Sequence, residues 1–281
     1  MSESIISQIF SVDVPKVLFH YTSSASLMGI LSSKKMWTTK IQYLNDNSEL
    51  KLAFDYIRNE IDQQRKGIGK TRTEEELNDM LSALDASETT NLSVASFTEM
   101  GDQLSQWRGY CEIGNGYSLG FNGSNLKHQV SKQSGYSLAP CVYKERIHKL
   151  IIKELVDSYP TKEMVKAADY AETPFIFSFS YSALLLAPII KSESFKEEKE
   201  WRLISPLLEY TNAGFRQGNH SLIPYWEFDL DIANTLDLIV IGPTPEPILS
   251  MRALEGLLLK ESFDIFQKAN ISQSKIPFRK V

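Results

Sequence analysis

Two spacings of hydrophobic residues alternate along the chain and predict an interleaved series of strands and helices. Short apolar runs between turn residues predict strands at 17–21, 36–41, 92–97, 117–121, 139–143, 200–207, 221–228 and 236–241, with an extended tail at 271–279. Apolar residues three and four positions apart predict helices at 24–33, 45–64, 73–84, 104–110, 145–159 and 246–261. The segment 162–190 is expected to be largely helical, with a break near Pro174.

The order of these elements bears on the fold class. Strands and helices are mixed without the strict alternation of a doubly wound fold, which predicts an α+β fold with mixed or mainly antiparallel sheets and flanking helices. No stretch rich in Pro, Gly or Ser divides the chain. We therefore expect one domain over residues 1–281, with a helical insertion at about 146–190.

Capping residues precede three of the expected helices. Ser23 is a candidate N-cap for 24–33, and Thr73 with Glu76 has the spacing of a capping box. Asn45 and Asp46 open the helix at 45–64, and capping explains this pair better than a chemical role does.

Composition and charge narrow the function classes. Of the 281 residues, 42% are apolar and 23% are charged, which is typical of a soluble globular protein and excludes a disordered or fibrous chain. The net charge of −5 disfavours a globally basic nucleic-acid binder, although Lys34, Lys35 and Lys40 could form a local basic edge.

The chain shows no sign of secretion, membrane insertion or metal binding. Cys111 and Cys141 are too few for a disulfide framework, and neither they nor the four histidines have the spacing of a metal site. The N-terminus lacks the basic start of a signal peptide. The longest apolar run, 183–190, is far shorter than the roughly 20 residues that span a bilayer. We expect a cytoplasmic protein with no membrane partner.

Two short motifs resemble known catalytic signatures. Gly67-Ile-Gly-Lys-Thr imitates a phosphate-binding loop, but Gln64 stands where that loop needs its first glycine. Gly116-Tyr-Ser-Leu-Gly matches a nucleophile elbow, and His220 could complete a serine hydrolase with Ser118. Because Ser118 falls inside an expected strand rather than at a strand-to-helix turn, this function stays a minor alternative.

Polar residues on the first strand form the first of three candidate binding segments. His20 and Thr22 share one face of this strand, and Phe19 and Tyr21 share the other. A histidine at a strand end can hold a ribose through an imidazole hydrogen bond. The alternative is a histidine with a purely structural hydrogen bond.

The second segment combines a strand with the short helix that follows it. Ser96 supplies a hydroxyl, Arg108 could bind a pyrophosphate through its planar donor fork, and Trp107 could stack on a base. The alternative is an aromatic packing anchor beside a surface arginine.

The third segment begins where a charged run becomes an apolar strand. If 198–202 is extended, Glu198, Glu200 and Arg202 line one face. Two acids on one face suit a reaction that passes through a cationic, oxocarbenium-like sugar. We expect a functional role for Glu200, whereas a solvated charged edge is the favoured interpretation for Glu197 and Glu198.

Taken together, these segments resemble a known family. The set comprises His20-Tyr-Thr-Ser, Tyr43-Leu-Asn-Asp, Ser96-Phe-Thr, Leu104-Ser-Gln-Trp-Arg-Gly-Tyr, Gly116-Tyr-Ser-Leu-Gly-Phe, Phe195-Lys-Glu-Glu-Lys-Glu-Trp-Arg and Ser274-Lys-Ile-Pro-Phe-Arg. It resembles the bacterial family called domain of unknown function 2971, over about 18–279. That family name implies no activity.

A more distant resemblance is to the ADP-ribosyltransferase superfamily, and it implies a site that uses NAD as substrate. By this resemblance His20 holds the nicotinamide ribose, Tyr21 or Trp107 stacks near nicotinamide, and Glu200 binds the ribose 2′-hydroxyl and stabilises the cationic sugar. The superfamily also places a hydroxyl or aromatic residue on a middle strand, and Ser96 or Tyr117 fills this middle position. The cofactor-binding set is then His20, Tyr21, Thr22, Ser96, Trp107, Arg108 and Tyr117.

The resemblance also implies a function in the cell. It predicts an ADP-ribosyltransferase or NAD glycohydrolase acting as a toxin or antiviral defence effector, with a protein, a nucleic acid or water as acceptor and a regulatory or antitoxin partner. The alternative is a non-catalytic sensor in which the same cleft holds a nucleotide or a peptide.

Overall fold

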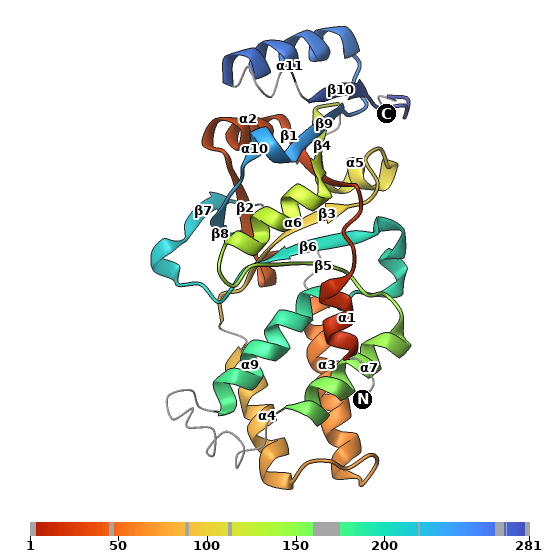
Figure 1. Ribbon diagram of the computed structural model, residues 1–281, viewed down its shortest axis with the longest axis vertical. Helices are drawn as coiled ribbons and strands as arrows, with labels where there is room; N and C mark the ends of the chain where they lie inside the picture. Colours follow the sequence, from red (N-terminus) through yellow and green to blue (C-terminus); the bar gives the residue numbers. More distant parts are fainter. Residues whose placement is uncertain are drawn as a thin grey trace.

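The computed structural model describes residues 4–44, 48–87, 90–111, 114–159, 175–218, 220–261, 267 and 269–278. Figure 1 shows an elongated molecule in which the strands and the helices α2, α6 and α11 occupy one half, while α1, α3, α4, α7 and α9 gather in the other. Both halves meet at the strands β5 and β6.

The strands form one branched sheet. They are β1 (Val17–Ser23), β2 (Lys35–Lys40), β3 (Ser93–Thr98), β4 (Gly116–Asn122), β5 (Ser137–Pro140), β6 (Glu200–Ile204), β7 (Gly214–Gln217), β8 (Leu222–Asp229), β9 (Leu236–Ile241) and β10 (Asn270–Gln273). The main path runs β10-β9-β4-β1-β3-β2-β8-β7, and β6 pairs with both β3 and β5. Only the β9–β10 ladder is parallel among the strand pairs of the described residues. The expected α+β class with a mostly antiparallel sheet is confirmed.

Strand β3 is the branch point of the sheet. Along one edge it pairs with β6 from Val94 to Thr98. On its other edge it meets β2 only at its start and β1 only at its end, where Thr98 lies opposite Phe19. The backbone of 95–97 has no ladder partner on that edge within the described ranges. The sheet is therefore split at the middle of β3.

Ten helices accompany the sheet in the described part of the chain. They are α1 (Ile5–Ser11), α2 (Ser24–Ser33), α3 (Ser48–Arg65), α4 (Glu74–Ser87), α5 (Leu104–Tyr110), α6 (Gly123–Lys132), α7 (Glu145–Ser158), α9 (Phe175–Leu186), α10 (Ile232–Thr235) and α11 (Pro247–Glu261). Short 3₁₀ helices lie at Ile41–Tyr43, Ala187–Ile189, Glu193–Glu198 and Tyr210–Asn212.

Two hydrophobic clusters pack on opposite faces of the β3–β6 pair. Val94 and Ile204 belong to the cluster formed with α3, α4, α7 and α9. Ala95 and Leu203, one position away on each strand, belong to the cluster that includes residues of α2, α6 and α11. Because side chains alternate across a strand, one pair of strands closes both cores and fixes the two halves against each other.

The expected elements agree closely with this fold. Helices α2 and α5 and strand β9 have the expected bounds, Ser23 accepts a hydrogen bond from the Ser26 amide, and Thr73 and Glu76 form the reciprocal capping box. The helices α1, α6 and the four-residue α10, and the strand β7, were not expected from the pattern. Asn45 and Asp46, and the expected break near Pro174, lie outside the described residues.

The first residue of α6 can be tested by substitution. A Cβ on Gly123 would lie 1.9 Å from the Pro15 carbonyl oxygen, which is backbone and cannot rotate away. We expect Gly123→Ala to lower the free energy of unfolding by about 1–3 kcal/mol in urea denaturation. Gly29→Ala is the control, because a Cβ there meets nothing within 4 Å and should stabilise α2 by up to about 1 kcal/mol. If both substitutions changed the free energy of unfolding equally, the backbone of Pro15 would not restrict position 123 to glycine.

Candidate functional site

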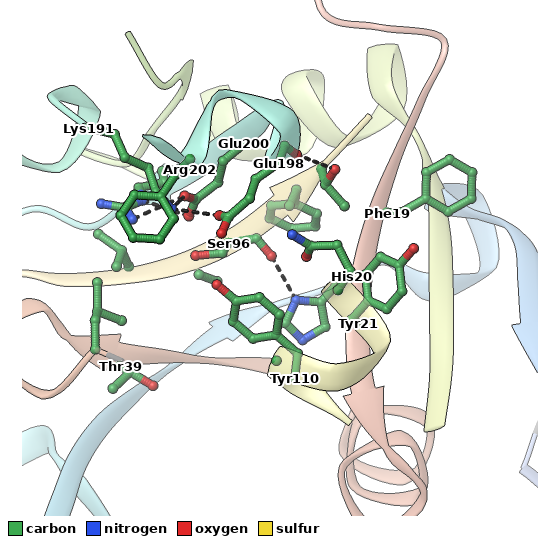
Figure 2. Close-up of a pocket in the computed structure, with 18 of the residues that line it drawn as sticks. Phe19, His20, Tyr21, Thr39, Ser96, Tyr110, Lys191, Glu198, Glu200 and Arg202 are labelled. Carbon is green, nitrogen blue, oxygen red and sulfur yellow. Dashed lines mark hydrogen bonds and ion pairs between the residues drawn. The ribbon is translucent and has the colours of Figure 1, made fainter. Parts of the chain in front are cut away.

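A pocket of about 720 Å³ opens beside the split in the sheet. Its walls come from β1, β2, β3, β6 and α5, from 191–198, and from Arg216 on β7. His20 and Glu200, which lie 180 positions apart in the sequence, both line it (Figure 2). The volume is within the range of small-molecule sites.

A buried cluster of four charges forms one wall of the pocket. Arg202 donates from Nε to Glu200 Oε1 at 2.8 Å and from Nη2 to Glu200 Oε2 at 3.2 Å. Lys191 Nζ donates to Glu200 Oε2 and to Glu198 Oε2, the latter at 2.7 Å. The side chains of Glu200, Arg202 and Lys191 are each 3% exposed, and that of Glu198 is 16% exposed. Glu198 is therefore the more accessible carboxylate.

The charge state of Glu200 follows from its surroundings. Burial alone would raise the pKa of this carboxyl, but the charges of Arg202 and Lys191 outweigh burial and lower the pKa to about 2. Glu200 is therefore ionised at neutral pH. The two cations and two carboxylates of the cluster sum to zero charge.

The two carboxylates reach the pocket from different backbone conformations. Glu200 begins β6, and its amide donates to the Tyr143 hydroxyl at 2.8 Å. Glu198 ends a 3₁₀ helix, and Lys199 between them is left-handed with φ 42°. The expected extended segment 198–202 thus starts only at Glu200. The interpretation of Glu197 and Glu198 as a solvated charged edge is wrong for Glu198, which lines the pocket and forms an ion pair with Lys191. It is confirmed for Glu197, which is exposed.

His20 bridges the split between β1 and β3. Its Nδ1 lies 2.9 Å from the Ser96 carbonyl oxygen, so it replaces a ladder bond that the diverging strands do not make. Since a carbonyl only accepts, Nδ1 carries the proton. Burial lowers the pKa of His20 against the opposing effect of this bond, so the ring is neutral at pH 7. Nε2 is then an acceptor available to a bound molecule.

Three more polar groups line the pocket without a protein partner among the described residues. They are the hydroxyl of Ser96, the side-chain amide of Gln106 and the hydroxyl of Tyr110. Gln106 is only 5% exposed, so its amide has little contact with bulk water. Because a buried polar group without a partner costs free energy, Gln106 favours a hydrogen-bonding ligand, whereas the more exposed Ser96 and Tyr110 can also bond to water.

Four of the expected binding residues do not line the pocket. Trp107 is buried edge-on against Tyr21 with 4.6 Å between ring centroids, and its Nε1 donates to Asp102. Thr22 is buried opposite Tyr117 in the β1–β4 ladder, and Tyr117 packs against the sheet core. Arg108 is exposed. Ser96 rather than Tyr117 is therefore the residue of the middle position that reaches the pocket.

Tyr21 does line the pocket, but its hydroxyl is already used. It donates to the Met100 carbonyl at 2.8 Å and accepts from the Gln103 amide at 2.9 Å. These bonds fix the turn that leads into α5. The geometry thus gives Tyr21 a supporting part in placing Gln106 and Tyr110.

Two other expectations are corrected by the structure. Ser118 is fully buried within β4, whereas His220 is exposed next to β8, and three strands separate β4 from β8 in the sheet, so they do not form a catalytic pair. The basic edge does not form, because Lys40 is buried against the Tyr210 hydroxyl and Lys35 pairs with Glu227.

The described residues hold no group of three or more His, Cys, Asp or Glu side chains arranged for a metal ion. Within the same residues, every helix is too short or too polar to cross a membrane.

Sequence comparison finds a family match over part of the chain. Residues 106–203 match the model of a family described as Protein of unknown function (DUF2971). This match supports the resemblance to that family, and it covers α5 from Gln106 onward, Glu198 and Glu200. Neither a curated protein nor a solved structure matches the chain.

Several pocket residues were missed by sequence reasoning. Gln106 and Tyr110 lie in the quoted motif Leu104-Ser-Gln-Trp-Arg-Gly-Tyr, from which only Trp107 and Arg108 were predicted to bind a ligand. On α5, Gln106 and Tyr110 are four positions apart and so share a helix face. That spacing was the available signal.

Proposed function

We propose that this pocket binds NAD and that the protein cleaves its nicotinamide–ribose bond, as an ADP-ribosyltransferase or NAD glycohydrolase. The observation that carries the proposal is the convergence of His20, Ser96 and Glu200 on one pocket. They come from β1, β3 and β6, in the order that the distant superfamily resemblance implies.

In this proposal His20, Glu198, Ser96 and Gln106 contact the ribose. His20 Nε2 accepts a hydrogen bond from a ribose hydroxyl, which agrees with its neutral state and its Nδ1 bond. The more accessible Glu198, rather than Glu200, faces the sugar, because both oxygens of Glu200 accept from Lys191 and Arg202 and hold these cations in the pocket wall. Ser96 and Gln106 supply further hydrogen bonds.

The proposed reaction breaks the C–N bond between ribose C1′ and nicotinamide, and the electron pair leaves with nicotinamide. An oxocarbenium-like centre forms at C1′, close to the Glu198 carboxylate. The acceptor oxygen then bonds to C1′ and its proton passes to Glu198. The acceptor is water, a protein or a nucleic acid.

The experiment is incubation of the protein with NAD labelled in the adenosine half, with and without a bacterial cell extract that supplies acceptors and activators. Nicotinamide release, or label on a macromolecule, is the expected result. Absence of both, under conditions in which NAD binds, would overturn the proposal.

A second candidate is a nucleotide-binding module without catalysis. It is favoured by one observation, that both oxygens of Glu200 are engaged by cations and the charge cluster is neutral. Such a protein would bind NAD or ADP-ribose and release it unchanged, so the same incubation separates the two candidates.

A further inference from the structure

The outer end of the pocket carries an aromatic platform. Trp37 on β2 lines the pocket, and its ring stacks on Tyr225 of β8 with 4.0 Å between centroids and 22° between planes. Trp37 remains 44% exposed, whereas the other three tryptophans of the chain are at most 5% exposed. One face of a rigid, supported indole is therefore open to a planar molecule.

A cation lies at the same end of the pocket. Arg216 on the neighbouring strand β7 lines the pocket, and its Nη2 donates to the Thr39 hydroxyl at 3.3 Å. Lys191 and Arg202 are paired with carboxylates, but Arg216 forms no ion pair with any described residue. An exposed guanidinium without a carboxylate partner is suited to a phosphate group.

We infer that this outer end is a nucleoside diphosphate subsite, in which the base stacks on Trp37 and Arg216 binds a phosphate. The inference deepens the proposed function, on which it rests for the choice of ligand. A dinucleotide would then lie along the pocket with its reacting ribose at His20 and Glu198 and its distal base at Trp37. The cross-strand stack alone would explain Trp37 and Tyr225, but not the adjacent unpaired arginine.

Binding can be followed through Trp37 itself, since it is the one exposed tryptophan. ADP, ADP-ribose, adenosine and ribose 5-phosphate are titrated into the full-length protein, with calorimetry as a second readout. ADP should quench the fluorescence and bind more tightly than adenosine or ribose 5-phosphate, because only ADP joins the base to the diphosphate.

Two variants test the two contacts. Trp37→Ala should weaken ADP binding about tenfold or more, since stacking on one aromatic contributes about 1–3 kcal/mol. Arg216→Gln should weaken it by a similar factor and reduce its salt dependence. The control for Trp37→Ala is Phe215→Ala, because Phe215 is an exposed aromatic residue on β7 that does not line the pocket. The control for Arg216→Gln is Arg252→Gln on α11, which also lies outside the pocket. Both should bind ADP as the wild type does, and melting curves should show all four variants folded.

The outcomes separate this inference from the proposed function. ADP binding that depends on Trp37 and Arg216, without NAD cleavage, would support the subsite and overturn the activity. NAD cleavage with ADP affinity unchanged in both variants would support the activity and overturn the subsite. Failure of ADP to bind, or Trp37-dependent binding of a single-stranded oligonucleotide in its place, would also overturn the subsite.

Discussion

Glutamine in place of Glu200 should lower the free energy of unfolding by about 3–5 kcal/mol. The carboxylate is 3% exposed, and its two oxygens accept from Arg202 and Lys191. Glutamine keeps one acceptor oxygen but removes the negative charge, so the buried Arg202 and Lys191 lose a carboxylate charge that balances them. Breaking one partner of a buried ion pair is costly, because the other charge stays desolvated. Urea denaturation at pH 7 measures the effect.

A matched surface pair provides the control. Lys35 and Glu227 are 2.6 Å apart but about 40% exposed, so Glu227→Gln should cost less than about 1 kcal/mol. Arg202→Met should destabilise as strongly as Glu200→Gln, and the double variant should cost less than the two together. A loss at Glu200 no larger than at Glu227, or additive effects, would argue against a tightly coupled cluster.

The pH dependence gives an independent test of the same cluster. The folded-state pKa of Glu200 is about 2, below the ordinary value of 4.5, because the cations outweigh burial. A depressed carboxyl pKa contributes stability that is present above the unfolded pKa and lost as the pH falls toward the folded one. The wild type should therefore lose stability between about pH 4.5 and pH 2 more steeply than Glu200→Gln.

Local patterns were sufficient to predict most elements of this fold. The capping box at Thr73 and the apolar spacing of α2 lie within single segments, so the sequence contains the whole signal. Helix α6 was missed, because only three of its ten residues are buried and only Leu126 and Val130 are hydrophobic. Its start is set by the Asn122 side chain and by the hydrogen bond from the Gly123 amide to the Lys16 carbonyl. Part of that signal lies outside the helix.

The site is harder to predict for the same reason. Strand alternation placed His20 and Thr22 on one face, but only the split between β1 and β3 decides that His20 reaches the pocket and Thr22 does not. Lys191 follows an apolar segment, and the short 3₁₀ helix Glu193–Glu198 brings Glu198 back to it. No hydrophobic periodicity in the sequence predicts this arrangement. Trp37 and Arg216 line the same pocket because β2 pairs with β8 and β8 with β7, although β2 is far in sequence from the other two strands.

Glutamine in place of Glu198 should lower kcat/KM for NAD cleavage about 100-fold or more, with a smaller loss of stability than Glu200→Gln, because Lys191 keeps its ion pair with Glu200. This side chain is 16% exposed and lines the pocket, and in the proposed reaction its negative charge stabilises the cationic sugar and takes the acceptor's proton. A well-placed general base contributes about 10²–10⁴ in rate. Glutamine keeps the shape and removes both effects. Nicotinamide release is the measurement, with urea denaturation in parallel.

The neighbouring residue is the control for this variant, because Glu197→Gln makes the same change of charge one position away. Glu197 is exposed and does not line the pocket. Loss of its charge therefore changes the long-range electrostatic field almost as much as Glu198→Gln does, but it removes no contact with the sugar. We expect its activity to stay within about twofold of the wild type, since exposed charges are screened within roughly 10 Å at 0.1 M salt. If both variants cleaved NAD at the wild-type rate, Glu198 would not be the reacting carboxylate. If both lost activity equally, the charge of the segment as a whole, rather than one positioned carboxylate, would drive the reaction.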